Sequence, residues 1–241
     1  MSRSILIFFL AILFTLAWHD VSHAQPDGGA TKQLWIDVNP AYFITPDFKL
    51  YGDVGFRREF DDYGWWRLVV RPAFEIHLGS IFYLTTGLGN FITFNEVGAD
   101  RWEFRPFQGL KFKWPNWKIP LRHYFRLEER YDFNTETWEA KNSLRFRYKL
   151  SFSYRWTARL QEDRFWQATL GAETFFKMAG EAGQFEEQTR ITLGLDRSLR
   201  RDLHMRFEIT WQVESLLFVS DQSVSNIYFR YRLFKSWGDQ K

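Results

Sequence analysis

The sequence predicts an all-β protein: an antiparallel up-and-down transmembrane β-barrel of ten or twelve strands behind a cleaved N-terminal signal peptide. Two observations predict this fold. Aromatic residues make up 20% of the 241 residues, with 26 Phe and 12 Trp, yet charged residues still make up 25%. In addition, large apolar residues alternate with charged ones, as they do when successive side chains of a strand point to opposite faces.

Residues 1–24 have the features of a signal peptide. A basic residue precedes an apolar run over 5–16, and Ala24 ends a cleavage site of small residues. The apolar run is shorter than the roughly 20 residues that a transmembrane helix needs. We therefore expect export, cleavage after Ala24 and a barrel domain over residues 25–241.

The alternation is clearest over residues 142–156. Its apolar parity consists of Leu144, Phe146, Tyr148, Leu150, Phe152, Tyr154 and Trp156. The opposite parity consists of Arg145, Arg147, Lys149, Ser151, Ser153 and Arg155. A helix would scatter these aromatic residues around its axis, so the pattern predicts a strand with one apolar and one charged face.

The same pattern recurs in eleven segments. They span 34–45, 48–60, 66–77, 81–94, 102–113, 119–133, 141–156, 165–176, 187–195, 203–214 and 225–234. Most have about 10–14 residues, which matches a tilted strand that crosses a bilayer and exceeds the usual strand of a soluble domain.

A soluble antiparallel sandwich also alternates apolar and polar residues, with its apolar face turned inward. Segment length favours the membrane barrel, and so does the position of tryptophan. Trp35, Trp66, Trp102 and Trp166 lie at the start of segments. Such a placement is typical of the aromatic girdles at the two membrane interfaces. We therefore expect the bacterial outer membrane as location, with its lipid and the barrel assembly machinery as partners.

The number of segments conflicts with the even strand number of bacterial single-chain barrels. Either 34–45 is not a complete spanning strand, which leaves ten, or one strand has been missed, which gives twelve. The sequence does not decide between ten and twelve.

Several motifs resemble a family of outer-membrane proteins of proteobacterial and Bacteroidetes type that is classed as a domain of unknown function. The most distinctive are Arg105-Pro106-Phe107-Gln108-Gly109, the run Arg122 to Arg130 with Arg126-Leu127-Glu128 at its centre, and Leu144-Arg145-Phe146-Arg147-Tyr148-Lys149-Leu150. The resemblance implies a barrel, and it implies no enzymatic activity.

The candidate functional residues are the charged side chains at the strand positions that we expect to face the lumen. Together they form a network of charges, called here the charge lattice. Its members are Arg57, Arg71, Glu75, Glu103, Arg105, Arg122, Arg126, Glu128, Arg130, Arg145, Arg147, Lys149, Glu173, Arg190, Arg206, Glu208, Arg230 and Arg232. A lumen of ten to twelve strands is narrow, so these groups must largely pair or be hydrated. Two interpretations follow: a salt-bridge lattice that fills a structural barrel, or a positively charged passage that favours small anionic solutes.

Enzymatic function is not expected. The alternative is a lipid-modifying or hydrolytic barrel enzyme that uses Ser80 and His77, with Glu75 on the same face as the histidine. Three scattered histidines after the signal peptide and the absence of cysteine give no metal signature and no cofactor. Basic residues interleaved with acidic ones do not suggest a nucleic-acid partner.

Overall fold

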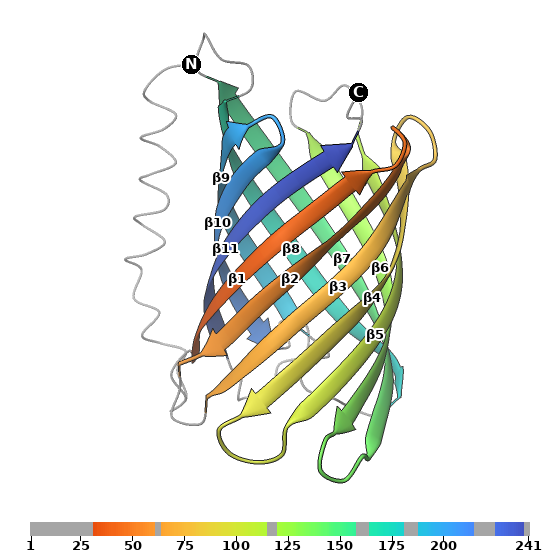
Figure 1. The fold of residues 1–241 in the computed structure, drawn as a ribbon, viewed down its shortest axis with the longest axis vertical. Coiled ribbons are helices and arrows are strands. Elements are labelled where there is room, and N and C mark those ends of the chain that lie inside the picture. Colours follow the sequence, from red (N-terminus) through yellow and green to blue (C-terminus); the bar gives the residue numbers. More distant parts are fainter. Residues whose placement is uncertain are drawn as a thin grey trace.

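The computed structural model describes residues 31–60, 64–114, 120–157, 164–180, 188–214 and 225–238, which form one closed barrel (Figure 1). Its strands are β1 (Thr31–Phe43), β2 (Phe48–Glu59), β3 (Trp65–His77), β4 (Phe82–Asn95), β5 (Arg101–Lys113), β6 (Leu121–Asn134), β7 (Ala140–Thr157), β8 (Phe165–Gly180), β9 (Gln188–Arg200), β10 (Leu203–Glu214) and β11 (Ser225–Gly238). The expected signal peptide lies outside the described residues. No helix long and apolar enough to cross a membrane occurs in the described ranges.

The barrel closes through a parallel pair of strands. Each strand from β1 to β11 pairs antiparallel with the next one along the chain, and β1 then pairs in parallel with β11, from Thr31 opposite Asn226 to Phe43 opposite Gly238. The prediction of ten or twelve strands is therefore wrong, because the described strands number eleven. An even number is required only when every neighbouring pair is antiparallel, and a parallel closing pair removes that requirement.

All eleven segments found in the sequence are strands, and the first is a full member of the barrel. The largest extension is in β9, which continues to Arg200 although its apolar alternation stops at Leu195. The outward position after Leu195 is Arg197, whose guanidinium lies 4.8 Å from the ring of Trp166. The last residues of β9 therefore keep the strand conformation although the outward side chains there are no longer apolar, which is why the sequence pattern ended too early.

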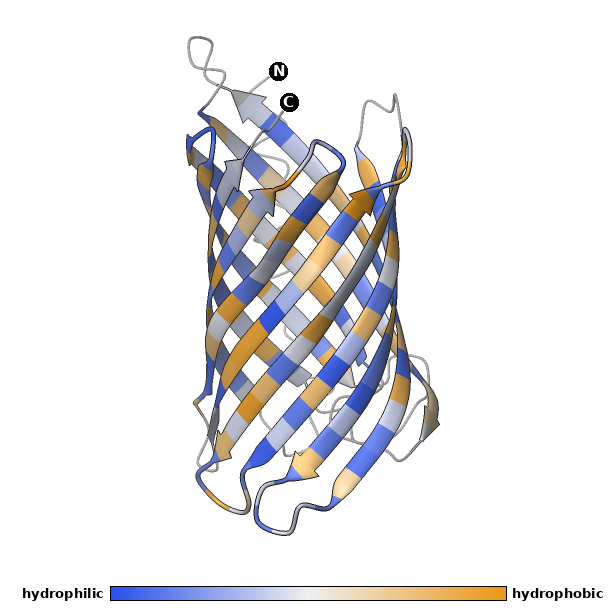
Figure 2. Ribbon diagram, turned by 45° about the vertical axis from the view of Figure 1, so that its right-hand side comes forward, coloured by the Kyte–Doolittle hydropathy of each residue, from blue (hydrophilic) through white to orange (hydrophobic). Residues whose placement is uncertain are grey.

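The barrel is apolar outside and polar inside. The alternation appears as successive hydrophobic and hydrophilic bands along each strand (Figure 2). Outward Val54 and Ile209 are each 53% exposed, whereas inward Asp37 and Glu128 are completely buried. Such burial of charge inside and exposure of aliphatic groups outside reverses the arrangement of a soluble sandwich.

Candidate functional site

The interior is organised around Glu128 of β6, whose side chain is completely buried. Its carboxylate accepts hydrogen bonds from Arg126 on the same strand and from Nη2 of Arg145 at 2.5 Å. Arg105 and Arg147 approach it at 3.5 and 3.9 Å. One carboxylate thus holds four guanidinium groups from three neighbouring strands, because Glu128 faces Arg145 directly in the β6–β7 register.

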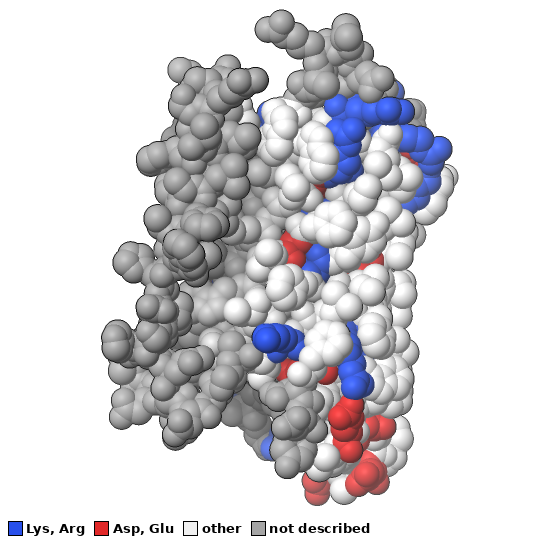
Figure 3. Space-filling model, turned by 90° about the vertical axis from the view of Figure 1, so that its left-hand side faces the viewer, with Lys and Arg blue, Asp and Glu red and all other residues white. Residues whose placement is uncertain are grey.

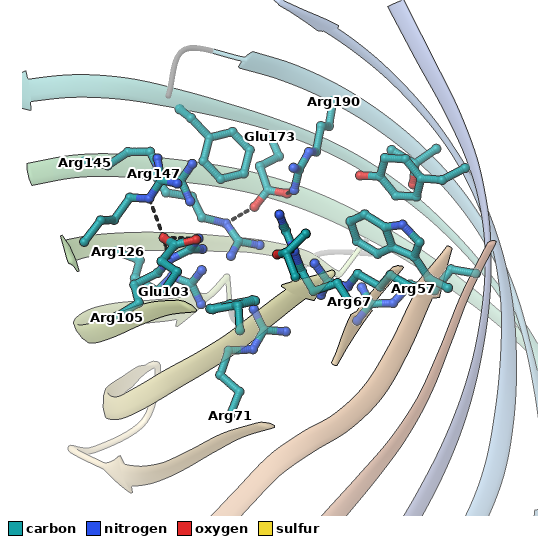
Figure 4. Close-up of a pocket in the computed structure, with 18 of the residues that line it drawn as sticks. Arg57, Arg67, Arg71, Glu103, Arg105, Arg126, Arg145, Arg147, Glu173 and Arg190 are labelled. Carbon is teal, nitrogen blue, oxygen red and sulfur yellow. Dashed lines mark hydrogen bonds and ion pairs between the residues drawn. The ribbon is translucent and has the colours of Figure 1, made fainter. Parts of the chain in front are cut away.

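Two further carboxylates extend this cluster around the barrel. Glu103 of β5 accepts hydrogen bonds from Nη2 of Arg105 at 2.6 Å and from Nε of Arg130 at 2.7 Å. Glu173 of β8 pairs with Arg147. Figure 4 shows Glu103, Arg147 and Glu173 pointing into the barrel from different strands. Ion pairs therefore run without interruption from β5 to β8.

A second chain of ion pairs crosses the parallel closure. Nε of Arg230 in β11 donates to Oδ2 of Asp37 in β1 at 2.5 Å. On the other side, Arg230 lies 3.7 Å from Glu208 of β10, which also contacts Arg206 at 3.3 Å. Arg206 in turn lies 2.5 Å from Asp196 of β9. The strands at the two ends of the barrel sequence are thus joined by buried charges as well as by backbone hydrogen bonds.

These chains enclose a chamber of about 100 Å³. Four of its lining residues are acidic: Glu103, Asp132, Glu173 and Glu208. Twelve are basic: Arg57, Arg67, Arg71, Arg101, Arg105, Arg126, Arg130, Arg145, Arg147, Lys149, Arg190 and Arg230. Three carboxylates outside the lining, Asp37, Asp53 and Glu128, bind lining arginines. Counting these three with the four acidic lining residues, twelve basic groups still face seven acidic ones, and this positive excess raises the local concentration of anions and lowers that of cations.

Tryptophan and phenylalanine side chains inside the barrel were not expected. Trp35 was predicted to belong to an interfacial girdle, but it points inward, is 5% exposed and stacks on Tyr228 with ring centroids 4.1 Å apart. Phe91 and Phe175 are also buried and line the chamber. Phe175 lies 4.6 Å from the guanidinium of Arg145. The alternation along β1 alone would have predicted that Trp35 points inward. Trp35 lies on the same face of the strand as three buried polar residues, Gln33, Asp37 and Asn39.

The structure brings most of the predicted lattice residues together at the chamber. Glu128 lies directly behind its lining, whereas four predicted residues lie elsewhere: Glu75, Arg122, Arg206 and Arg232. Glu75 binds Lys49 at 2.5 Å and Lys111 at 2.6 Å in a separate cluster. Arg122 is exposed. Among the lining residues that are missing from the predicted charge lattice are Arg101, Asp132 and the threonines Thr93, Thr192 and Thr210.

The histidine of the enzymatic alternative has a different partner from the one expected. Nδ1 of His77 lies 3.0 Å from Oδ1 of Asp47 in the β1–β2 turn, and the ring stacks on Tyr83. Glu75 is occupied by its two lysines. No hydrogen bond joins Ser80 to His77 within the described part of the chain. The geometry therefore does not assemble the predicted Ser80–His77–Glu75 arrangement.

The described residues contain no group of acidic or histidine side chains arranged to hold a metal ion. Comparison with functionally curated proteins gives no match. A family model with the description "Protein of unknown function (DUF2490)" matches residues 32–217, which covers the described strands from β1, except its first residue, to β10. This match confirms the resemblance to a domain of unknown function, and the chain belongs to the DUF2490 family.

Proposed function

We propose that this protein resides in the bacterial outer membrane and crosses it as the eleven-stranded barrel. The strands have 12 to 18 residues, and about 9–11 suffice for a tilted strand to span the hydrocarbon core. Large apolar side chains cover the outside, among them Ile36, Leu193 and Phe229. On the face in Figure 3, charged atoms are few across the described surface, and their larger groups lie toward its two ends. Exposed apolar area on this scale would make a soluble protein aggregate.

The function that the geometry supports best is a narrow passage that favours small anions. The observation that carries this proposal is the lining of the chamber, with twelve basic and four acidic residues. Three lining cations, Arg57, Arg67 and Lys149, form no ion pair among the described residues and create a positive potential, as charged rings do in selective pores. The interior ion pairs leave a chamber of about 100 Å³, which limits the passage to small solutes. A lattice that merely filled a structural barrel would need no such excess of positive charge.

Purified protein in a planar lipid bilayer is expected to conduct, with a reversal potential in a KCl gradient that reports chloride permeating better than potassium. Lys149→Gln removes a lining cation that has no ion pair among the described residues. At an effective dielectric constant of about 20, a unit charge within about 15 Å of a permeating ion contributes about 1 kcal/mol or more, so the permeability ratio should fall at least about fivefold.

The matched control is Lys141→Gln, because Lys141 is exposed at the start of β7 and should leave the ratio unchanged. Silence of a barrel that has demonstrably folded, or a preference for potassium, would contradict the proposed passage. If the folded barrel does not conduct, the other interpretation remains, in which salt bridges fill a structural barrel.

A further inference from the structure

Arg57 of β2 is a buried cation with no carboxylate within ion-pair distance among the described residues. It is 7% exposed, and within the described residues it makes neither a hydrogen bond nor an ion pair. Its Nε atom has no partner, and its guanidinium lies 3.8 Å from the ring centroid of Trp35. Stacking on an indole stabilises a guanidinium, but it does not satisfy the N–H donors at the edge of the group.

The residue opposite Arg57 on β3 is also a cation, which makes the unpaired charge of Arg57 less favourable. In the β2–β3 register, Arg57 faces Arg67, and like charges directly opposite on neighbouring strands are destabilising. Arg67 donates from Nε to the hydroxyl oxygen of Thr93 at 2.6 Å, and it makes no ion pair in the described part of the chain. Both side chains reach into the chamber from neighbouring strands (Figure 4).

The same two strands also contain an arginine whose charge is paired with a carboxylate. Four residues further along β3, Arg71 faces Asp53 and binds it through two parallel hydrogen bonds of 2.8 and 2.9 Å. The structure thus supplies a bonded carboxylate for Arg71, whereas Asp37 and Glu103 attract Arg57 and Arg67 only from beyond ion-pair distance. Leaving a charge buried and unpaired costs several kcal/mol, and proteins retain such costs mainly at functional sites.

We propose that Arg57 and Arg67 form a binding site for a tetrahedral oxyanion of the phosphate and sulfate type. Each guanidinium is a planar fork that donates to two oxygens at once. A tetrahedral oxyanion offers oxygens to both forks, whereas chloride has no such geometry and one carboxylate occupies a single fork. Tyr228 covers one face of Trp35 and Arg57 lies over the indole as well, so that ring is not open for an aromatic ligand.

The size of the chamber sets the upper limit of the ligand. Its volume of about 100 Å³ is smaller than the roughly 150 Å³ of an engineered apolar cavity that takes up benzene. An inorganic oxyanion suits this space better than a nucleotide or a sugar phosphate. This inference rests on the proposed function only in that the anion reaches the site through the chamber.

Binding is tested by titrating inorganic phosphate, and separately sulfate, into the refolded protein in detergent micelles at constant ionic strength, with heat release as the readout. We expect one oxyanion per barrel and no comparable heat from chloride. Arg57→Gln and Arg67→Gln should each weaken phosphate binding at least about tenfold, because a charge-assisted bidentate contact is lost. Arg57→Lys keeps the charge but loses the fork, so its affinity should lie between those of the wild type and Arg57→Gln.

The matched control is Arg58→Gln. Arg58 is the next residue of β2, points outward and pairs with the exposed Glu96 at 2.5 Å, so phosphate affinity should stay at the wild-type level. Equal phosphate binding by the Arg57→Gln and Arg58→Gln proteins would overturn the site, and so would chloride binding as strongly as phosphate.

Folding gives a second readout that a purely structural arginine would not produce. Without phosphate, Arg57→Gln should unfold at the same urea concentration as the wild type or a higher one, because it removes an unpaired buried charge. Phosphate should then raise the midpoint of the wild type and not that of the variant. A variant that is destabilised equally with and without phosphate would contradict the proposal.

The two proposals fail independently. A barrel that binds phosphate in micelles but never conducts would refute the passage and leave the site. A barrel that conducts chloride, but neither binds phosphate nor is blocked by it, would refute the site and leave the passage.

Discussion

Glu128→Gln is expected to lower the free energy of unfolding of the barrel by about 3–5 kcal/mol, the typical cost of removing one partner from a buried ion pair. The substitution keeps the size of the side chain and removes only its charge. Glu128 is completely buried and is the shared partner of Arg126 and Arg145, with two more guanidinium groups within 4 Å. Without this charge, Arg126 and Arg145 would lose their shared carboxylate while Arg105 and Arg147 remain close to them.

The measurement is urea unfolding in lipid vesicles, followed by tryptophan fluorescence, with the midpoint and slope compared between proteins. Glu136→Gln is the matched control, because Glu136 is exposed in the β6–β7 turn and should change stability by less than about 0.5 kcal/mol. If the two variants unfold at the same urea concentration, Glu128 does not organise the interior.

Asp37→Asn should produce the second-largest loss, about 3 kcal/mol, because it breaks the buried ion pair across the parallel closure. Asp37 is completely buried, and its Oδ2 atom accepts the 2.5 Å hydrogen bond from Arg230. Gly55 on β2 leaves room for this carboxylate: a Cβ atom at position 55 would lie 2.1 Å from Oδ1 of Asp37. The carboxylate therefore lies tightly between the closing strand pair and β2.

Asp47→Asn serves as the control for Asp37→Asn. Asp47 also contacts a positively chargeable group, His77, but its side chain is 70% exposed, and exposed pairs contribute about 0–1 kcal/mol. Urea unfolding and the yield of refolded barrel are compared. A loss for Asp37→Asn no larger than for Asp47→Asn would mean that buried charge does not stabilise the β1–β11 closure.

The strands could be predicted from the sequence because alternation is a local signal. Each segment carries its own period of two, so all eleven segments could be found without knowing their neighbours. The closure could not be predicted in this way, since it joins residues about 200 positions apart and leaves no local pattern. The rule of even strand number then led to the wrong count, although the alternation alone had identified eleven segments.

The candidate site was predictable to a lesser degree. Parity identifies which side chains point inward, and it correctly separates Arg57 from Arg58. It does not identify partners, because these depend on the register between strands. Register places Glu128 opposite Arg145 but Arg57 opposite Arg67, and nothing in the spacing of these residues distinguishes the two cases. The inward Trp35 was misassigned because its position at the start of a segment was weighed above its parity.

In the outer membrane, we expect one face of every strand to contact lipid and the other to face the charged interior. The natural chain has no cysteine, so single cysteines can be introduced without background. Three pairs of adjacent residues are suitable, each with an outward aliphatic member and an inward threonine that lines the chamber: Ile92 and Thr93, Leu193 and Thr192, and Ile209 and Thr210.

The measurement is the accessibility of a nitroxide label at each of these cysteines to oxygen dissolved in the bilayer and to a water-soluble relaxing agent, in vesicles of outer-membrane lipid. We expect high oxygen accessibility at positions 92, 193 and 209, and protection from oxygen at 93, 192 and 210. Equal access of the water-soluble agent to both members of each pair, or a protein that stays outside the vesicles, would contradict it.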